Sequence, residues 1–379
     1  MAKQWTVMVY MAADNSFNED LFKDLTDEAK ADHEEMMAVG SNKDLDIVVQ
    51  IDWNFSATGK RPQRLHVLPG RLDVIQEAPG PIDIGVGSSL EHFLVWAHDN
   101  FASPRELVIL WGHATNLAFG FDASDALTTH ALQAPAIADA IDFALPAAAD
   151  SERLLGFDAC GFSTFETAYE LSKSAQYMLA SEIGMPLPGW PYTDVLKAIA
   201  ETPQISPQDL GQEIVSRFVD HYPDKTVALT MLDLPAAHSN GLADALQELA
   251  VALALRVGTD PKPREAVIEL FRDCRVPTGE PLVDVAQLCN SLSQAGISER
   301  VDGAARAMAT SLRDSGLIFD NKRHGDGATE LCGLSVYAPH VGRPFDRWFD
   351  VYEQLALSRE AIIWPELVKF LLLADSLGG

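Results

Sequence analysis

Two side chains in the sequence have the chemistry of a nucleophile and its base, and each ends an apolar segment. His113 ends ELVILWGH (residues 106–113), and Cys160 ends RLLGFDAC (residues 153–160). Both segments have the composition of buried strands. If they are neighbours in a parallel sheet, both side chains project from the same sheet edge. A histidine there can hold the thiolate that attacks a carbonyl carbon and can later protonate the leaving amine.

Each residue alone has a simpler interpretation. A single cysteine at a strand end is more often a small buried hydrophobe, and a single histidine is more often structural. Their occurrence at successive strand ends favours the catalytic interpretation. The other cysteines form no CxxC pair and no Cys/His cluster at zinc-ligand spacing, so the sequence predicts neither a disulfide framework nor a metal site. We expect all three to be structural: Cys274, Cys289 and Cys332.

The chain around the two residues could also stabilise the charges that form during the reaction. Cys160 lies at the transition from a strand to a predicted helix over residues 162–173, whose N-terminus would favour a thiolate. The backbone N–H of Cys160 is a natural donor to an oxyanion. Gly112 would let the chain turn sharply just before His113.

Alternating strand and helix signals predict the sheet that would position these residues. Apolar runs predict strands over residues 5–13, 44–52, 106–113, 153–160 and 176–182, with a hairpin arm at 64–68. Helical patterns occur between them at residues 17–39, 88–100, 131–145 and 162–173. This order predicts an α/β fold in which helices cover both faces of a mostly parallel sheet.

The pattern changes after Glu182. A further strand is predicted over residues 225–234, mainly helical sequence follows over 235–313, and a late strand is predicted at 331–339. No internal repeat or linker separates the two halves. We therefore predict a core of residues 1–234 and a mainly helical elaboration of residues 235–379 packed on it.

Composition excludes some classes of partner. The net charge is −27, from 55 acidic and 28 basic residues, so the surface repels nucleic acid and anionic lipid. It could attract basic peptides, although a high charge more often serves solubility. No GxGxxG or Walker motif supports nucleotide binding. No signal-peptide pattern or bilayer-length apolar run is present, and we expect a cytoplasmic protein unless a signal was removed.

Several segments together resemble the clostripain family of cysteine peptidases, relatives of caspases and gingipains. They lie within residues 5–192, with weaker similarity at PLVDVAQL and GLSVYAP: TVMVYMAADN, DIVVQID, LVILWGH, LLGFDACGFSTFETAYEL, YMLASE and PGWPY. The resemblance implies a caspase-like three-layer α/β/α sandwich, with His113 as general acid/base and Cys160 as nucleophile. The spacing between the two is close to the roughly 50 residues typical of caspases.

The resemblance also implies cleavage after Arg or Lys. Asp158 matches the family acid two residues before the nucleophile, and residues two apart on a strand point to the same side. A carboxylate there would pair with a substrate guanidinium. Glu182 follows the fifth strand, where caspase-like folds often build the pocket wall, and is a second substrate-binding candidate. No cofactor is required by the sequence. Clostripain itself is linked to calcium, so that ion is expected as an optional one, although no calcium-loop signature is present.

The sequence departs from the family in two places. The family usually has Gly after the catalytic histidine, and its N–H is commonly an oxyanion donor; here Ala114 requires either a negative φ or a distorted oxyanion hole. Residues 114–152 contain no Lys or Arg, so we predict no self-cleavage there. A regulatory protein, small ligand or cation could then restrain the enzyme. The alternative is a catalytically weak or inactive caspase-like scaffold that binds a peptide or protein partner.

Overall fold

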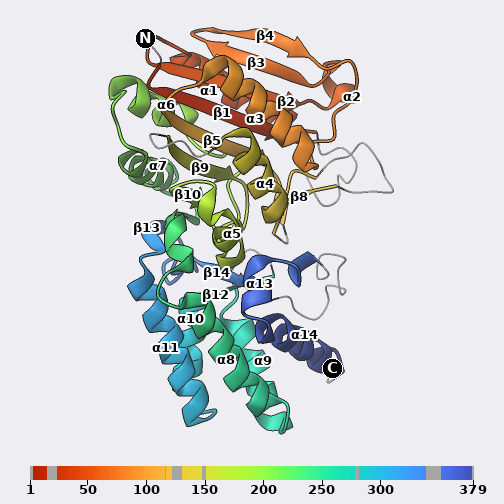
Figure 1. Ribbon diagram of the computed structural model, residues 1–379, viewed down its shortest axis with the longest axis vertical. Helices are drawn as coiled ribbons and strands as arrows, with labels where there is room; N and C mark the ends of the chain where they lie inside the picture. Colours follow the sequence, from red (N-terminus) through yellow and green to blue (C-terminus); the bar gives the residue numbers. More distant parts are fainter. Residues whose placement is uncertain are drawn as a thin grey trace.

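A nine-stranded sheet occupies the upper part of the molecule as drawn in Figure 1, above the C-terminal helices. The computed structural model describes residues 3–14, 24–115, 117–121, 130–146, 151–277, 281–338 and 351–377. The strand order is β13-β11-β10-β9-β5-β1-β2-β3-β4. The strands are β1 (Trp5–Ala12), β2 (Leu45–Asp52), β3 (Gln63–Leu68), β4 (Arg71–Glu77), β5 (Arg105–Gly112), β9 (Glu152–Asp158), β10 (Tyr177–Ala180), β11 (Val227–Asp233) and β13 (Ile318–His324).

The five central strands, from β10 to β2, run parallel, and the outer strands on both sides are antiparallel. Side chains of the central strands are buried on both faces. Along β1, Val7 and Val9 pack into one hydrophobic core, whereas Met8 and Tyr10 pack into the other. This two-sided burial explains why the central strands have continuous apolar sequences.

Helices cover both faces of the sheet, which confirms the predicted α/β sandwich. One layer consists of α1 (Thr26–Val39), α6 (Tyr192–Glu201) and α7 (Pro207–His221). The other contains α3 (Gly87–Phe101), α4 (Ala134–Ala144) and α5 (Phe165–Glu170), which is followed by the 3₁₀ turn η2 (Leu171–Lys173). The helix predicted over residues 17–39 is α1, although its residues 17–23 lie outside the described part of the chain.

The C-terminal half is mainly helical and continues from the second of these layers (Figure 1). Its helices are α8 (Leu242–Val257), α9 (Pro261–Asp273), α10 (Val285–Gln294), α11 (Glu299–Ser315), α13 (Ala356–Glu360) and α14 (Ile363–Leu377). It also holds a two-stranded sheet of β12 (Leu282–Asp284) and β14 (Ser335–Tyr337). Backbone hydrogen bonds attach this sheet to the core, since Ser335 N–H donates to the Ser163 carbonyl at 3.0 Å.

Strand β13 was not predicted from the sequence. Its residues IFDNKRH are polar and partly exposed, and the strand pairs only with β11 at the edge of the sheet. Edge strands commonly carry charged side chains, which prevent further pairing but also remove the apolar pattern that marks a strand. The remaining elements are short: α2 (Phe55–Thr58), η3 (Leu234–His238), and a small sheet of β6 (Ala114–Thr115), β7 (Ala118–Phe119) and β8 (Leu132–Gln133).

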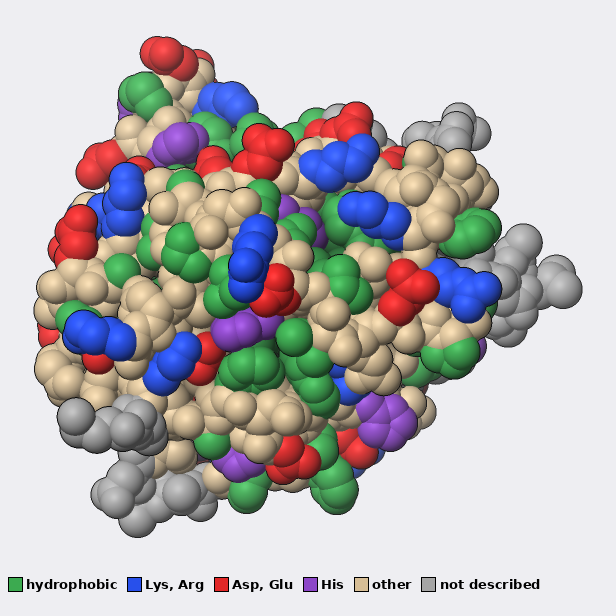
Figure 2. Space-filling view, turned by 90° about the horizontal axis from the view of Figure 1, so that it is seen from above, with side chains coloured by type: hydrophobic (Ala, Val, Ile, Leu, Met, Phe, Trp, Pro, Cys, Tyr) green, Lys and Arg blue, Asp and Glu red, His purple; other side chains and the backbone are tan. Residues whose placement is uncertain are grey.

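The surface shown in Figure 2 carries acidic and basic side chains interspersed, with no large area of a single sign. The excess of acidic residues is therefore not concentrated on this face. Within the described ranges, no helix has the length and apolar character needed to cross a membrane.

Candidate active site

His113 and Cys160 follow neighbouring strands, which meets the condition that the sequence had left open. β5 and β9 pair in parallel, and the last pair in their register is Trp111 with Asp158. His113 and Cys160 each lie two residues beyond that pair, at the carboxyl edge of the sheet. Both are partly buried. Ligands of parallel sheets bind at this edge, so the two side chains occupy the place expected of catalytic residues.

A sharp turn after β5 fixes the backbone of His113. Gly112 has φ +150°, and a Cβ there would lie 3.1 Å from both the Cβ and the carbonyl oxygen of Ala12. The carbonyl of His113 accepts a hydrogen bond of 3.1 Å from Gly120 N–H. A glycine is thus required before the histidine, and the β6–β7 hairpin holds the residue after the turn.

Ala114 has the backbone conformation that an alanine adopts without strain. It lies in β6, and among the described non-glycine residues only Leu117 and Asn240 have positive φ. Hydrogen-bonded and non-hydrogen-bonded pairs alternate along an antiparallel ladder. Since Gly120 N–H donates to His113, the next pair, Ala114 with Phe119, is a non-hydrogen-bonded one. The N–H of Ala114 is therefore not used in a hydrogen bond to Phe119 within the hairpin. Of the two expected alternatives, a negative φ or a distorted oxyanion hole, Ala114 has the negative φ.

The Cys160 sulfur accepts a hydrogen bond that the sequence did not reveal. The backbone N–H of Met185 donates to Cys160 Sγ at 3.2 Å. Gly161, with φ +62°, donates its N–H to the Ile183 carbonyl at 3.1 Å, which holds the same loop against the nucleophile. An N–H directed at sulfur stabilises a thiolate more than a thiol. Met185 lies 25 residues from Cys160 along the chain, and no local pattern marks it.

The helix after Cys160 begins later than predicted. α5 starts at Phe165 rather than at residue 162, and its N-cap Thr164 accepts a hydrogen bond from Thr167 N–H. The residues between Cys160 and α5 are held instead by other segments: Ser163 N–H, for example, donates to the Ser181 carbonyl at 3.0 Å. The N-terminus of this short helix is therefore not what contacts the Cys160 sulfur. The N–H of Met185 makes that contact.

Asp158 contacts the same loop as Cys160. Its Oδ2 accepts hydrogen bonds of 3.0 Å from Trp190 N–H and from the Tyr192 hydroxyl. Gly189 lies directly against the carboxylate: its φ is +66°, and a Cβ there would be 2.6 Å from Oδ2. The loop of residues 183–192 thus touches the nucleophile near one end and Asp158 near the other. Asp158 itself is only 5% exposed.

The charged groups that act on Asp158 are acidic. Burial raises the pKa of Asp158 to about 7, the Trp190 and Tyr192 hydrogen bonds lower it, and Glu35 raises it further. On α1, burial raises the pKa of Asp32 to about 9, and Asp158 is the next largest cause. Asp32 accepts a hydrogen bond of 2.6 Å from Trp111 Nε1. A cation placed beside Asp158 and Asp32 would therefore be stabilised by these carboxyl groups. Asp32 was not predicted, because a single Asp on a charged helix has no distinguishing pattern.

Replacement of Asp32 by Asn should change how stability depends on pH. In the folded protein Asp32 keeps its proton up to a pH of about 9, whereas the unfolded chain releases it near its ordinary value of 3.8. Its contribution to stability is therefore present at low pH and is lost as the pH rises across this window. The Tm of Asp32→Asn minus that of the wild type should increase by several degrees between pH 5 and pH 9.

Thermal unfolding at a series of pH values measures this difference. The matched control is Glu34→Gln on the same helix, whose exposed side chain should leave Tm nearly unchanged at each pH. A Tm difference for Asp32→Asn that is flat with pH would show that the buried carboxyl has no raised pKa.

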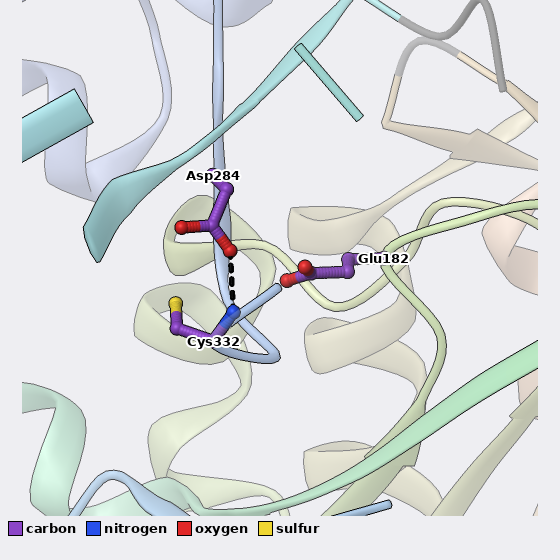
Figure 3. A group of neighbouring side chains, drawn as sticks. All are labelled: Glu182, Asp284 and Cys332. Atoms are coloured by element: carbon purple, nitrogen blue, oxygen red, sulfur yellow. Dashed lines mark hydrogen bonds between the residues drawn. The ribbon is translucent and has the colours of Figure 1, made fainter. Parts of the chain in front are cut away.

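Glu182 lies in different surroundings from the other predicted site residues. Its side chain has no exposed surface and points toward Asp284 and Cys332 (Figure 3). The substrate-binding role of Glu182 stays a prediction, because a substrate side chain would reach this carboxyl group only after the surrounding chain moves.

Comparisons with known proteins found a matching family model and solved structures with a similar fold. The model of the clostripain family matches residues 9–370. The chain is similar in fold to a secreted C11 cysteine protease from Bacteroides thetaiotaomicron, solved with an irreversible peptide inhibitor (17% identity, TM-score 0.67, covering 95% of this chain and 99% of that one). It is also similar to an inactive zymogen C11 protease from Parabacteroides distasonis (15% identity, TM-score 0.67, covering 95% and 99%). No curated protein matches the sequence.

Proposed function

Since the chain belongs to the clostripain family and is therefore a cysteine protease, we propose that it cleaves peptide bonds after Arg or Lys with Cys160 as nucleophile and His113 as general acid/base. The observation that carries the dyad is the parallel pairing of β5 and β9, which brings both residues to one sheet edge. The N–H of Met185 at Cys160 Sγ favours the thiolate over the thiol.

The proposed reaction has two stages. The Cys160 thiolate attacks the carbonyl carbon of the scissile bond, and the oxyanion that forms accepts hydrogen bonds from the N–H groups of Cys160 and Ala114. His113, which holds the thiol proton, then protonates the leaving amine as the C–N bond breaks. A water molecule hydrolyses the thioester, with His113 removing the proton of the water, and the thiol is regenerated.

Asp158 gives the proposed preference for a basic residue before the cut. It lies two residues before the nucleophile and contacts the loop that also contacts Cys160, and the charged groups that act on it, Glu35 and Asp32, are acidic. A substrate guanidinium or ammonium would supply the cation that this region lacks and would favour the ionised carboxylate. Because Asp158 has little exposed surface, residues 183–192 must shift when a long side chain enters.

Fluorogenic peptides that differ only in the residue before the cut test this proposal. We expect cleavage after Arg and Lys, and little after Glu or Leu, in assays with and without calcium. No cleavage of any peptide, together with failure of an arginine-directed alkylating inhibitor to label Cys160, would instead support a peptide-binding scaffold. Equal cleavage of all peptides would contradict the specificity while leaving the protease assignment intact.

The oxyanion role of Ala114 predicts a contrast between two substitutions. Ala114→Pro removes the N–H donor and should lower kcat by roughly 10²–10³-fold, as loss of one oxyanion donor does elsewhere. Ala114→Gly keeps the N–H and should change kcat by less than about tenfold. Peptide hydrolysis measures both, with the Tm of each variant as the folding control. Equal activity of the two variants would assign the oxyanion to other donors.

The absence of Lys and Arg from residues 114–152 predicts that the enzyme acts as a single chain. Intact mass after prolonged incubation with wild-type enzyme checks this, and a cut within that segment would contradict it. Regulation would then come from a protein, a small ligand or a cation.

The cytoplasmic location stays a prediction, which fractionation of the source cells tests.

A further inference from the structure

Three potential metal ligands from separate parts of the chain meet beside the active-site loop. Glu182 follows β10, Asp284 ends β12, and Cys332 precedes β14 (Figure 3). Their ligand atoms, two carboxylate oxygens and one sulfur, all lie within 4.8 Å of one another. The cluster is separate from the proposed catalytic residues, and the family assignment does not require it.

Glu182 is the unusual member of this cluster. It has no exposed surface, and neither carboxyl oxygen has a hydrogen-bond partner of good geometry in the described part of the chain, although the Gly333 N–H and the Asp284 carboxyl lie close enough to act on its pKa. Burial raises the pKa of Glu182 well above its ordinary value, and the neighbouring Asp284 raises it further. An unpaired buried carboxyl group costs free energy, so the chain gains if a ligand at this place satisfies it.

The other two residues are already oriented by the backbone. Asp284 Oδ1 accepts a hydrogen bond of 2.7 Å from Gln287 N–H, and Oδ2 accepts one of 2.6 Å from Cys332 N–H. The Cys332 thiol lies 3.3 Å from the Leu334 carbonyl, and the residue is partly buried. Hydrogen bonds that hold ligands in place are typical of protein metal sites.

We propose that Glu182, Asp284 and Cys332 bind a divalent transition-metal ion of the zinc type. One sulfur and two carboxylate ligands suit zinc, whereas calcium prefers oxygen ligands alone. Zinc–ligand distances of about 2.0–2.3 Å place tetrahedral ligands roughly 3.5 Å apart, so the side chains need to close by only about 1 Å. A water molecule completes the fourth position. Binding displaces the protons of the Cys332 thiol and of the Glu182 carboxyl to solvent.

A metal here would join the C-terminal half to the loop beside the nucleophile. Glu182 is three residues before Met185, whose N–H contacts the Cys160 sulfur. Asp284 and Cys332 belong to the segments that form the two-stranded sheet of the C-terminal half. The ion would therefore restrain residues 182–185, which lie directly beside the proposed catalytic residues.

Cobalt(II) absorption tests the site with the full-length protein, because a thiolate bound to Co²⁺ gives a charge-transfer band in the near ultraviolet. The wild type should bind one equivalent of Co²⁺ with this band, and Zn²⁺ should displace it and raise Tm by about 3 °C. Cys332→Ser should lose the band. Glu182→Gln, which keeps the side-chain shape, should weaken Co²⁺ binding by at least about tenfold.

Two matched variants separate this site from the other cysteines and from the proposed function. Cys160→Ala removes the proposed nucleophile. Cys274→Ser alters a buried cysteine that is not a proposed ligand, although its backbone carbonyl accepts a hydrogen bond of 3.0 Å from Asp284 N–H, which the substitution keeps. Both variants should keep the Co²⁺ band. Because Cys160→Ala is inactive under the proposed function, metal binding by this variant does not depend on that proposal. In the wild type, Zn²⁺ should protect Cys332 from alkylation and leave Cys160 reactive, a measurement that needs no variant.

Four results would overturn the proposal. The first is a wild type that gives no thiolate band with Co²⁺ and no protection of Cys332 by Zn²⁺, in which case Glu182 and Asp284 simply share a proton. The second is a band that persists in Cys332→Ser, and the third is a band that disappears in Cys160→Ala. Binding of Ca²⁺ without binding of Co²⁺ or Zn²⁺ would also contradict a site that contains a thiolate ligand.

Discussion

Cys160→Ala should lower kcat on Arg and Lys peptides by roughly 10⁴–10⁶-fold. The substitution removes the atom that forms the covalent intermediate, and the remaining oxyanion donors and substrate contacts provide only residual catalysis. The fold should be little affected, because the residue is partly exposed and the substitution to Ala leaves no large cavity, although it removes the hydrogen bond from Met185 N–H. Peptide hydrolysis and thermal unfolding measure the two effects separately.

The dyad predicts a particular pattern among the variants. His113→Ala should cause a loss of similar size, and the double variant should be little worse than either single one, because residues that act together are not additive. Cys274→Ser is the matched control, because Cys274 is buried beside Ser291 and does not belong to the loop that contacts Cys160. This variant should keep activity within about twofold. Residual turnover above about 1% in Cys160→Ala would mean that another residue is the nucleophile.

Asp158→Asn should reduce kcat/KM for Arg and Lys peptides by about 30- to 5,000-fold. The amide can still accept hydrogen bonds from Trp190 and Tyr192, but it leaves the cation of the substrate without a counter-charge, a loss of about 2–5 kcal/mol in buried charge pairs. Peptides with a neutral residue before the cut, which are poor substrates, should change little. The comparison of kcat/KM between basic and neutral peptides is the measurement.

The pH profile gives a second test of the same residue. The pKa of Asp158 in the free enzyme is raised to about 7, so as the pH falls below 7 the carboxyl becomes protonated and binding of a basic side chain weakens. kcat/KM of the wild type for Arg peptides should decline on this acid side more steeply than the rate of Cys160 alkylation by neutral iodoacetamide. In Asp158→Asn the two profiles should have the same shape.

Glu166→Gln is the matched control for Asp158→Asn. Glu166 is also a buried acid whose pKa burial raises to about 7, but it lies on α5 and accepts its hydrogen bonds from Tyr337 and Tyr352. Its substitution should leave the ratio of kcat/KM for basic and neutral peptides unchanged. If Asp158→Asn lowers kcat/KM equally for every peptide, or if Glu166→Gln matches its effect, Asp158 has a structural role and does not select the substrate.

The sequence alone determined the central sheet and the place of the dyad. Parallel strands buried on both faces require continuous apolar runs, and such runs are visible locally in β1, β2, β5 and β9. Once the strands are known, chain order places His113 and Cys160 at strand ends, and only the adjacency of β5 and β9 is left to establish. The position of Asp158 relative to Cys160 could also be predicted from the sequence, because the spacing of the two residues along the chain is short and fixed.

Only the tertiary structure decided the contacts between distant segments. The N–H of Met185 reaches Cys160, and Asp32 lies near Asp158, because loops and helices pack onto the strand ends, and packing leaves no periodic signal in the sequence. The same holds for β13, whose polar residues gain strand structure only by pairing with β11. Glu182, Asp284 and Cys332 are the extreme case. The spacing rules for metal ligands describe ligands that are close in sequence, whereas these three are brought together only when the C-terminal half packs against the end of the sheet.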